Sequence, residues 1–182
     1  MAFPVLLDTC AIYGAGLTDL LLTMAEKGMF RPLWSDEVLG ELHRVLVEAG
    51  IDKDAVERRI TSMGQAFPDA RVTGYEALIP HMACDENDRH VLAAAVRGGA
   101  AVVVTFNLKH FPKTALAQYE LTAVHPDEFL LDQLDLYATK AVEAVVQVPA
   151  SYENPPVTVA EFLDLLERSG VPKFVRAINA II

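Results

Sequence analysis

The fold follows from a short run near the start of the chain, Val5-Leu6-Leu7-Asp8-Thr9-Cys10, in which apolar residues end abruptly in an acid. Such a run predicts a strand that is buried on both faces, as the strands of a parallel sheet are. Asp8 would then lie at the carboxyl end of the strand, where open parallel sheets bind ligands and metals. Because a buried carboxylate must be hydrogen-bonded, paired or bound to a cation, Asp8 is either a capping residue or a functional one.

Strands and helices are predicted to alternate from this run to about residue 135. Further strands are expected at residues 31–34, 70–73, 100–104 and 119–124. Helices are expected at about 17–27, from 35 onward, at 52–67, from 85 to 98, and from 126 onward. The alternation predicts an α/β protein, a three-layer α/β/α sandwich around a central parallel sheet.

After residue 135 the pattern predicts helices only. One helix is expected at about 136–146, followed by a linker at 149–156 that contains Pro155-Pro156. Thr158 and Glu161 form a capping box that opens the next helix, and a last helix is expected from Lys173. We therefore divide the chain into a domain at residues 1–135 and a helical C-terminal extension at residues 136–182. The apolar residues of the extension either pack on the sheet domain or form a surface for another chain.

Composition limits the functions that fit this chain. It has 182 residues, of which 52% are hydrophobic and 22% charged, with a formal net charge of -10. An acidic protein does not bind a polyanion over its whole surface, so a nucleic-acid substrate would require a local basic patch, a metal ion or the charge of a partner. Cys10 and Cys84 lie far apart without a CxxC spacing, which predicts reduced thiols. No signal peptide and no membrane-spanning run is recognised, so we expect a cytoplasmic protein.

Several polar residues are predicted to meet Asp8 at the carboxyl edge of the sheet. Asp88 lies at the inner edge of a helix that opens with acids, although acids also suit a helix N-terminus. Thr105 and Asn107 follow the strand at 100–104, where the alternative interpretation is a simple turn. Lys109 would supply one positive charge there, able to meet a phosphate.

Glu37 and Glu41 lie four residues apart on one helix face and are surface glutamates by default. One of them is expected to face Asp8, and the sequence leaves open which.

Carboxylates gathered in this way indicate a particular chemistry. Oxygen ligands without Cys or His select magnesium or manganese rather than zinc. A divalent ion removes the repulsion between the acids and makes a bound water a better nucleophile, which suits phosphodiester hydrolysis. We interpret His90 as a hydrogen-bonded structural residue, because nothing nearby in the sequence completes a His-rich metal set.

Four segments of the chain resemble the motifs of the PIN domain family, in the order that the family has them. They are Leu7-Asp8-Thr9, Ser35-Asp36-Glu37-Val38-Leu39-Gly40-Glu41-Leu42, Asp85-Glu86-Asn87-Asp88-Arg89-His90-Val91-Leu92-Ala93 and Val104-Thr105-Phe106-Asn107-Leu108-Lys109-His110-Phe111-Pro112. The segment Pro126-Asp127-Glu128-Phe129-Leu130 resembles the one that often closes the domain. The resemblance covers residues 3 to 135 and is closest to bacterial VapC-like toxins, including those with a helical C-terminal extension.

This resemblance implies a Mg²⁺- or Mn²⁺-dependent endoribonuclease, commonly the toxin of a type II toxin–antitoxin pair. Asp8, Glu41 and Asp88 would be its three acids and metal ligands, with Asn107 in the fourth position and Thr105 as the ordering hydroxyl. The implied partners are an RNA substrate, a cognate antitoxin protein and a second copy of the chain in a homodimer. The chain departs from the family pattern at Cys10, where many members have Asn, and at Asn107, where Asp is frequent.

Two other functions are alternatives to the ribonuclease. A catalytically silent binding module with the same fold would act through its helical tail, and the uncharged Asn107 and the acidic net charge favour it. A phosphatase with an aspartyl nucleophile is less favoured, because that chemistry usually requires a second Asp two residues after the first, where Cys10 stands.

Overall fold

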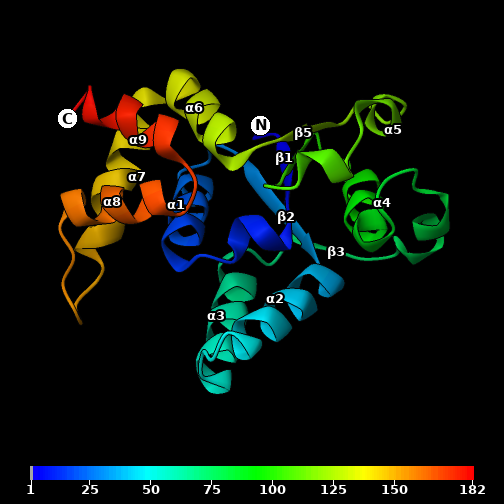
Figure 1. The fold of residues 1–182 in the computed structure, drawn as a ribbon, viewed down its shortest axis with the longest axis horizontal. Coiled ribbons are helices and arrows are strands. Elements are labelled where there is room, and N and C mark those ends of the chain that lie inside the picture. The colour runs from blue at the N-terminus through cyan, green and yellow to red at the C-terminus, as the bar shows by residue number, and fades with distance from the viewer. Residues whose placement is uncertain (1) are drawn as a thin grey trace.

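A single parallel sheet forms the centre of the computed structural model, which describes residues 2–182 (Figure 1). Its strands are β1 (Pro4–Leu7), β2 (Arg31–Ser35), β3 (Arg71–Val72), β4 (Val102–Val104) and β5 (Thr122–Val124). Their order is β3-β2-β1-β4-β5, and every neighbouring pair is parallel. In β1, Leu6 is paired with Leu33 of β2 and with Val103 of β4. The predicted α/β/α architecture is therefore confirmed.

The strand order reverses between β1 and β4. From β1 the chain continues outward to β2 and β3, and β4 then returns to the other side of β1. The connections that follow β1 and β4 therefore leave toward opposite sides of the sheet. In open parallel sheets this arrangement opens a crevice at the carboxyl ends of the two strands. Asp8 follows β1 and Thr105 follows β4, and the Asp8 amide donates to the Val104 carbonyl over 3.1 Å. The order of the strands thus brings the two predicted site residues together.

Helices cover both faces of the sheet. The α-helices are α1 (Ala15–Glu26), α2 (Asp36–Glu48), α3 (Lys53–Ala66), α4 (Arg89–Arg97), α5 (Lys113–Ala117), α6 (Pro126–Leu136), α7 (Ala138–Ala150), α8 (Val159–Arg168) and α9 (Pro172–Asn179). Short 3-10 helices are η1 (Thr9–Ile12), η2 (Glu76–His81), η3 (Glu86–Asp88) and η4 (Leu108–His110). In Figure 1, α4 lies on one side of the sheet and α1 with α7, α8 and α9 on the other, while α2 and α3 extend away as a hairpin.

Three local predictions were wrong. The helix expected from Asp85 is divided into η3 and α4, because the Asp85 carboxylate caps η3 by accepting from the Asn87 amide. The helix expected to end near 146 continues to Ala150, so Pro149 belongs to it; Pro149 is buried in the last turn, where it removes one backbone donor. Ile51, which the apolar spacing around the helix at 52–67 predicts to face inward, is 49% exposed because it precedes the cap of α3. Helix α5 was not predicted.

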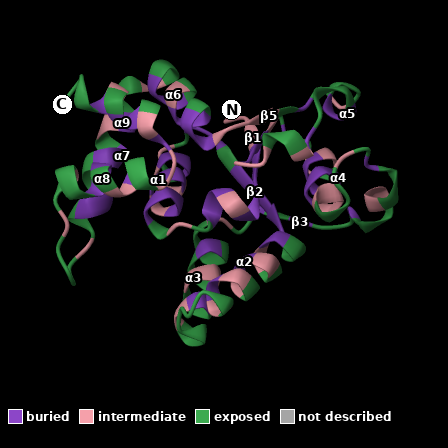
Figure 2. Cartoon of the chain, viewed as in Figure 1, coloured by how far each residue is buried: buried purple, intermediate pink, exposed green. Residues whose placement is uncertain are grey.

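The C-terminal helices pack onto the rest of the molecule. Phe162 of α8 and Phe174 of α9 are fully buried, and Phe162 lies against Gly16 of α1, where a Cβ would be 3.3 Å from its ring. The Asp127 carboxylate on α6 accepts hydrogen bonds from the amides of Lys173 and Phe174 at the start of α9. Buried positions continue from the central strands through α1 into α7, α8 and α9 (Figure 2). The boundary between residues 135 and 136 stays a prediction.

Within residues 2–182, no helix is both long enough and apolar enough to cross a membrane.

We predict that the sheet and the C-terminal helices unfold together. Phe162→Ala should lower the free energy of unfolding by about 3–5 kcal/mol, the usual cost of a phenylalanine-sized cavity. Circular dichroism and the fluorescence of Trp34, the single Trp, buried in β2, should follow the same shifted transition. Val146→Ala, at a position that is 46% exposed on α7, is the control and should change stability by less than about 0.5 kcal/mol. An unshifted Trp34 transition in Phe162→Ala would show two independent units.

Candidate active site

The residues predicted from the strand ends line one cavity of about 340 Å³. Its wall is formed by Asp8, Thr9, Cys10, Tyr13, Glu41, Val45, Asp88 and Asn107. The structure therefore brings Asp8, Glu41, Asp88 and Asn107 together, as expected. Thr105 lies directly behind Asp8, and Lys109 is exposed on η4 away from the cavity wall.

Asp8 is the most deeply buried acid of the cavity, with 3% of its surface exposed. One carboxylate oxygen accepts from the Thr9 amide at 2.7 Å. The other accepts from the Thr105 hydroxyl at 2.7 Å and from the Cys10 thiol at 3.2 Å. These donors come from the turn after β1 and from the end of β4, and they satisfy part of the hydrogen-bonding capacity of the carboxylate. No Lys, Arg or His pairs with Asp8 among residues 2–182, so its charge is directed toward the cavity.

Glu41 rather than Glu37 reaches the cavity. Helix α2 begins at Ser35, whose hydroxyl accepts from the Val38 amide, and this cap sets the direction in which the helix passes the sheet edge. One turn into the helix, the Glu41 carboxylate accepts from the Thr9 hydroxyl at 2.8 Å. Glu37 accepts instead from the Tyr75 hydroxyl at 3.2 Å, outside the cavity.

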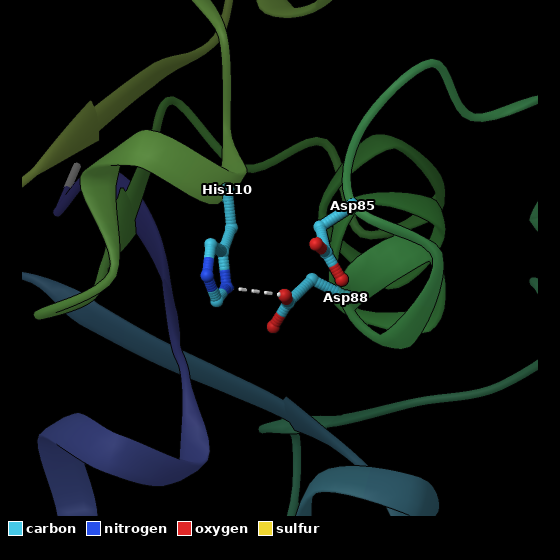
Figure 3. A group of neighbouring side chains, drawn as sticks. All are labelled: Asp85, Asp88 and His110. Carbon is cyan, nitrogen blue, oxygen red and sulfur yellow. Dashed lines mark hydrogen bonds and ion pairs between the residues drawn. The ribbon is translucent and has the colours of Figure 1, made fainter.

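Asp88 also lines the cavity, and it lies close to two residues outside the wall that the sequence did not identify as site residues. Figure 3 shows Asp85, Asp88 and His110 facing one another. His110 Nδ1 lies 2.8 Å from Asp88 Oδ2, and potential ligand atoms of the three side chains lie within 4.8 Å of one another. The sequence indicates Asp85 only as an acid that suits a helix N-terminus, and His110 only as a member of the segment 104–112. The two are brought together by the Asp85 amide, which donates to the His110 carbonyl and joins η3 to η4, and local sequence patterns do not signal such a contact between distant segments.

The environment of Asp88 disfavours its charge. Burial raises the pKa of the Asp88 carboxyl, and the negative charge of Asp8 raises it further. The hydrogen bond and the charge of His110 act in the opposite direction and lower that pKa. A divalent cation between Asp8 and Asp88 would remove the repulsion, so the electrostatics of the cavity fit a metal ion.

The geometry of the donors fits a hydrated ion. Within residues 2–182, Asp85, Asp88 and His110 are the only group of three or more potential ligands whose ligand atoms all lie within 4.8 Å of one another. Asp8 and Glu41 are not part of this group. Magnesium needs no compact protein cage, because it retains several waters and is held by one or two carboxylates. The wider set of Asp8, Glu41 and Asp88 therefore fits Mg²⁺ or Mn²⁺ better than it fits zinc.

His90 differs from its prediction. It was expected to be hydrogen-bonded, but its largely buried Nδ1 has no hydrogen-bond partner in the described part of the chain. The ring lies between two acids of α2, with Nδ1 3.9 Å from Glu37 and Nε2 4.0 Å from Glu41. The prediction was wrong because the acids of α2 approach α4 without closing to hydrogen-bond distance.

Cys10 occupies the position at which the family often has Asn, and it bridges the two central strand ends. Its thiol donates to Asp8, accepts from the Phe106 amide at 3.3 Å and lies 3.4 Å from the Thr105 hydroxyl. Burial, followed by the charge of Asp8, raises the pKa of the Cys10 thiol to about 12. In the metal-free protein at neutral pH the Cys10 thiol is therefore protonated, and it donates to Asp8 and helps to hold that carboxylate in place.

Comparison with known proteins identifies two regions of the chain. Residues 4–109 match the family model described as PIN domain, and residues 126–180 match the one described as VapC50 C-terminal domain. A protein of Mycobacterium tuberculosis named "Putative ribonuclease VapC50" is 51% identical over 116 residues, which cover 63% of this chain and 67% of that protein. No solved structure matches the chain.

The raised pKa of Asp88 predicts how stability depends on pH. Because the folded protein holds the Asp88 proton more tightly than the unfolded chain does, this residue costs stability as the pH rises from about 3.9, the ordinary pKa of Asp, through its raised pKa. Asp88→Asn removes the charge and keeps an oxygen that can accept from His110. In EDTA, the variant should therefore gain unfolding free energy relative to the wild type between pH 4 and pH 7, measured by urea denaturation. A difference that is constant or shrinks with rising pH would contradict this assignment.

Proposed function

This chain belongs to the PIN domain family, and from that premise we propose that it is a metal-dependent endoribonuclease that hydrolyses RNA phosphodiester bonds. The observation that carries the proposal is the buried Asp8, held at the switch point of the sheet in one cavity with Glu41 and Asp88. No cationic side chain within residues 2–182 pairs with Asp8, so the carboxylates of the cavity wall suit a metal ion that in turn binds a phosphate of the substrate. RNA as the substrate is supported by the name of the mycobacterial relative.

Each polar residue of the cavity has a proposed role. Asp8 and Asp88 would hold the metal ion directly, and Glu41, oriented by the Thr9 hydroxyl, would position the attacking water and accept its proton. Thr105 keeps Asp8 in place through its hydroxyl, which also accepts from the Asn107 amide at 3.0 Å. Asn107, on the same wall, would offer a neutral amide oxygen to the ion.

The cofactor that we propose is Mg²⁺ or Mn²⁺. When bound, such an ion lowers the pKa of its water and neutralises charge that develops on the phosphoryl group. Mg²⁺ or Mn²⁺ is favoured over zinc because the carboxylates of Asp8, Glu41 and Asp88 on the cavity wall are hard oxygen ligands.

We extend the proposal to the cellular role. By analogy with its VapC50 relative, the chain would act in the cytoplasm as the toxin of a type II toxin–antitoxin pair. The antitoxin would cover the acidic cavity, and it would be basic where it meets a chain with a net charge of -10. A homodimer is the proposed assembly. Residues 1–135 would be the nuclease domain, and residues 136–182 an extension that supports α1.

A catalytically silent module is the second candidate, and the uncharged Asn107 on the cavity wall is the observation that favours it. It predicts a folded protein without metal-dependent cleavage.

Cleavage of a mixed RNA panel tests the two candidates. We expect cleavage in Mg²⁺ or Mn²⁺ and none in EDTA. Asp8→Asn and Asp88→Asn should each lower the cleavage rate by more than roughly 100-fold. Loss of a residue that only hydrogen-bonds to a metal ligand can already cost about 100-fold, and loss of a ligand itself should cost more. Glu41→Gln should lower it as well, whereas Glu37→Gln, one helical turn away and outside the cavity, should cleave like the wild type.

Circular dichroism of every variant would show that the fold is retained. Cleavage that survived both Asp substitutions would refute the assigned site, and a folded wild type that cleaved nothing with metal present would favour the silent module.

A further inference from the structure

Among residues 2–182, Tyr13 is the only exposed aromatic residue. The chain contains eight Phe, five Tyr and one Trp, all within the described residues, and every other one is buried or partly buried. Tyr13 is 44% exposed. A single exposed apolar residue is unremarkable by itself, but this one lies on the wall of the acidic cavity, beside Asp8, Glu41 and Asp88. The exposed ring of Tyr13 is therefore available to a ligand of this cavity.

The backbone that carries Tyr13 is firmly anchored. Tyr13 follows η1, whose last residue, Ile12, is fully buried. Arg59 of α3 donates to the Ile12 carbonyl at 2.8 Å and to the Tyr13 carbonyl at 3.3 Å. The same guanidinium donates to the Thr18 hydroxyl at 2.7 Å and so connects this turn to α1. A tyrosine on a fixed backbone has only two side-chain torsions to restrict when it binds a ligand, so it provides a large contact area at a low cost in conformational entropy.

The charge of the cavity limits how RNA is held there. None of the residues on its wall is Lys or Arg, and the chain as a whole is strongly acidic. The phosphate contacts that usually dominate affinity for nucleic acid are therefore not provided by the cavity wall. Stacking on an aromatic ring needs no charge, and every base has a face that can stack.

We propose that Tyr13 is a stacking platform for a nucleobase beside the scissile phosphate. The inference rests on the proposed ribonuclease function and adds to it a residue that contacts the substrate. Bases in a duplex are already stacked on their neighbours, whereas those in loops and single strands can turn onto a protein ring. Val45 completes an apolar edge of the same cavity.

The test is the kinetics of Tyr13 variants on a single-stranded RNA in Mn²⁺. Tyr13→Ala and Tyr13→Leu should raise KM by roughly 5- to 150-fold, the range for loss of one base–aromatic stack. Their kcat should change by less than about threefold, because stacking holds substrate and transition state alike. Tyr13→Phe keeps the ring and should stay within about twofold of the wild type, and Tyr13→Leu shows that an apolar side chain alone is insufficient.

A matched change in the RNA identifies the stacked base. An abasic nucleotide at one position next to the cut should raise the KM of the wild type and have no further effect on Tyr13→Ala. Quenching of 2-aminopurine at that position, measured in Ca²⁺, reports stacking without cleavage, and it should require Tyr or Phe at position 13.

The outcomes separate this inference from the proposed function. If the wild type cleaves RNA and Tyr13→Ala has the same KM, stacking is refuted and the nuclease stands. If no RNA is cleaved but 2-aminopurine is quenched only when an aromatic ring is present, stacking stands and hydrolysis is refuted. If neither cleavage nor quenching occurs, both are wrong, and Tyr13 is left as a contact for a protein.

Discussion

The structure depends on the burial of one carboxylate. Asp8 has 3% of its surface exposed at the end of a strand whose residues Val5 to Leu7 are fully buried. An ionised group in such a place is tolerated only when its hydrogen bonds are satisfied. The donors are supplied by Thr9, Cys10 and Thr105, so β1, η1 and β4 must meet in a single register. The polar site and the centre of the sheet are therefore built by the same contacts.

The same arrangement carries a cost that is linked to function. Asp88 comes from a different segment, and its pKa is raised by burial and by the charge of Asp8, so the metal-free cavity works against the stability of the fold. His110 partly offsets this cost through its hydrogen bond to Asp88. Repulsion of this kind is retained at functional sites because a bound cation converts it into affinity.

The sequence predicted the sheet and much of the site because both depend on local patterns. Apolar runs that end in polar residues, such as 5–8 and 100–105, determine the strands and place Asp8 and Thr105 at one edge. What it could not predict depends on contacts between distant segments. The choice between Glu37 and Glu41 is decided by Thr9 and Tyr75, which lie far from α2 in the sequence. The proximity of His110 to Asp88 and the exposure of Tyr13 likewise follow from how loops pack rather than from periodicity.

The central claim is that carboxylates from separate segments form one site for a divalent cation. Calorimetric titration of the metal-free protein with Mn²⁺ at pH 7.5 tests it directly and requires no knowledge of the RNA target. The account predicts saturable binding to the wild type and to Glu37→Gln, and loss of that binding in a folded Asp8→Asn variant. Binding to Asp8→Asn that equals that of the wild type would contradict the account.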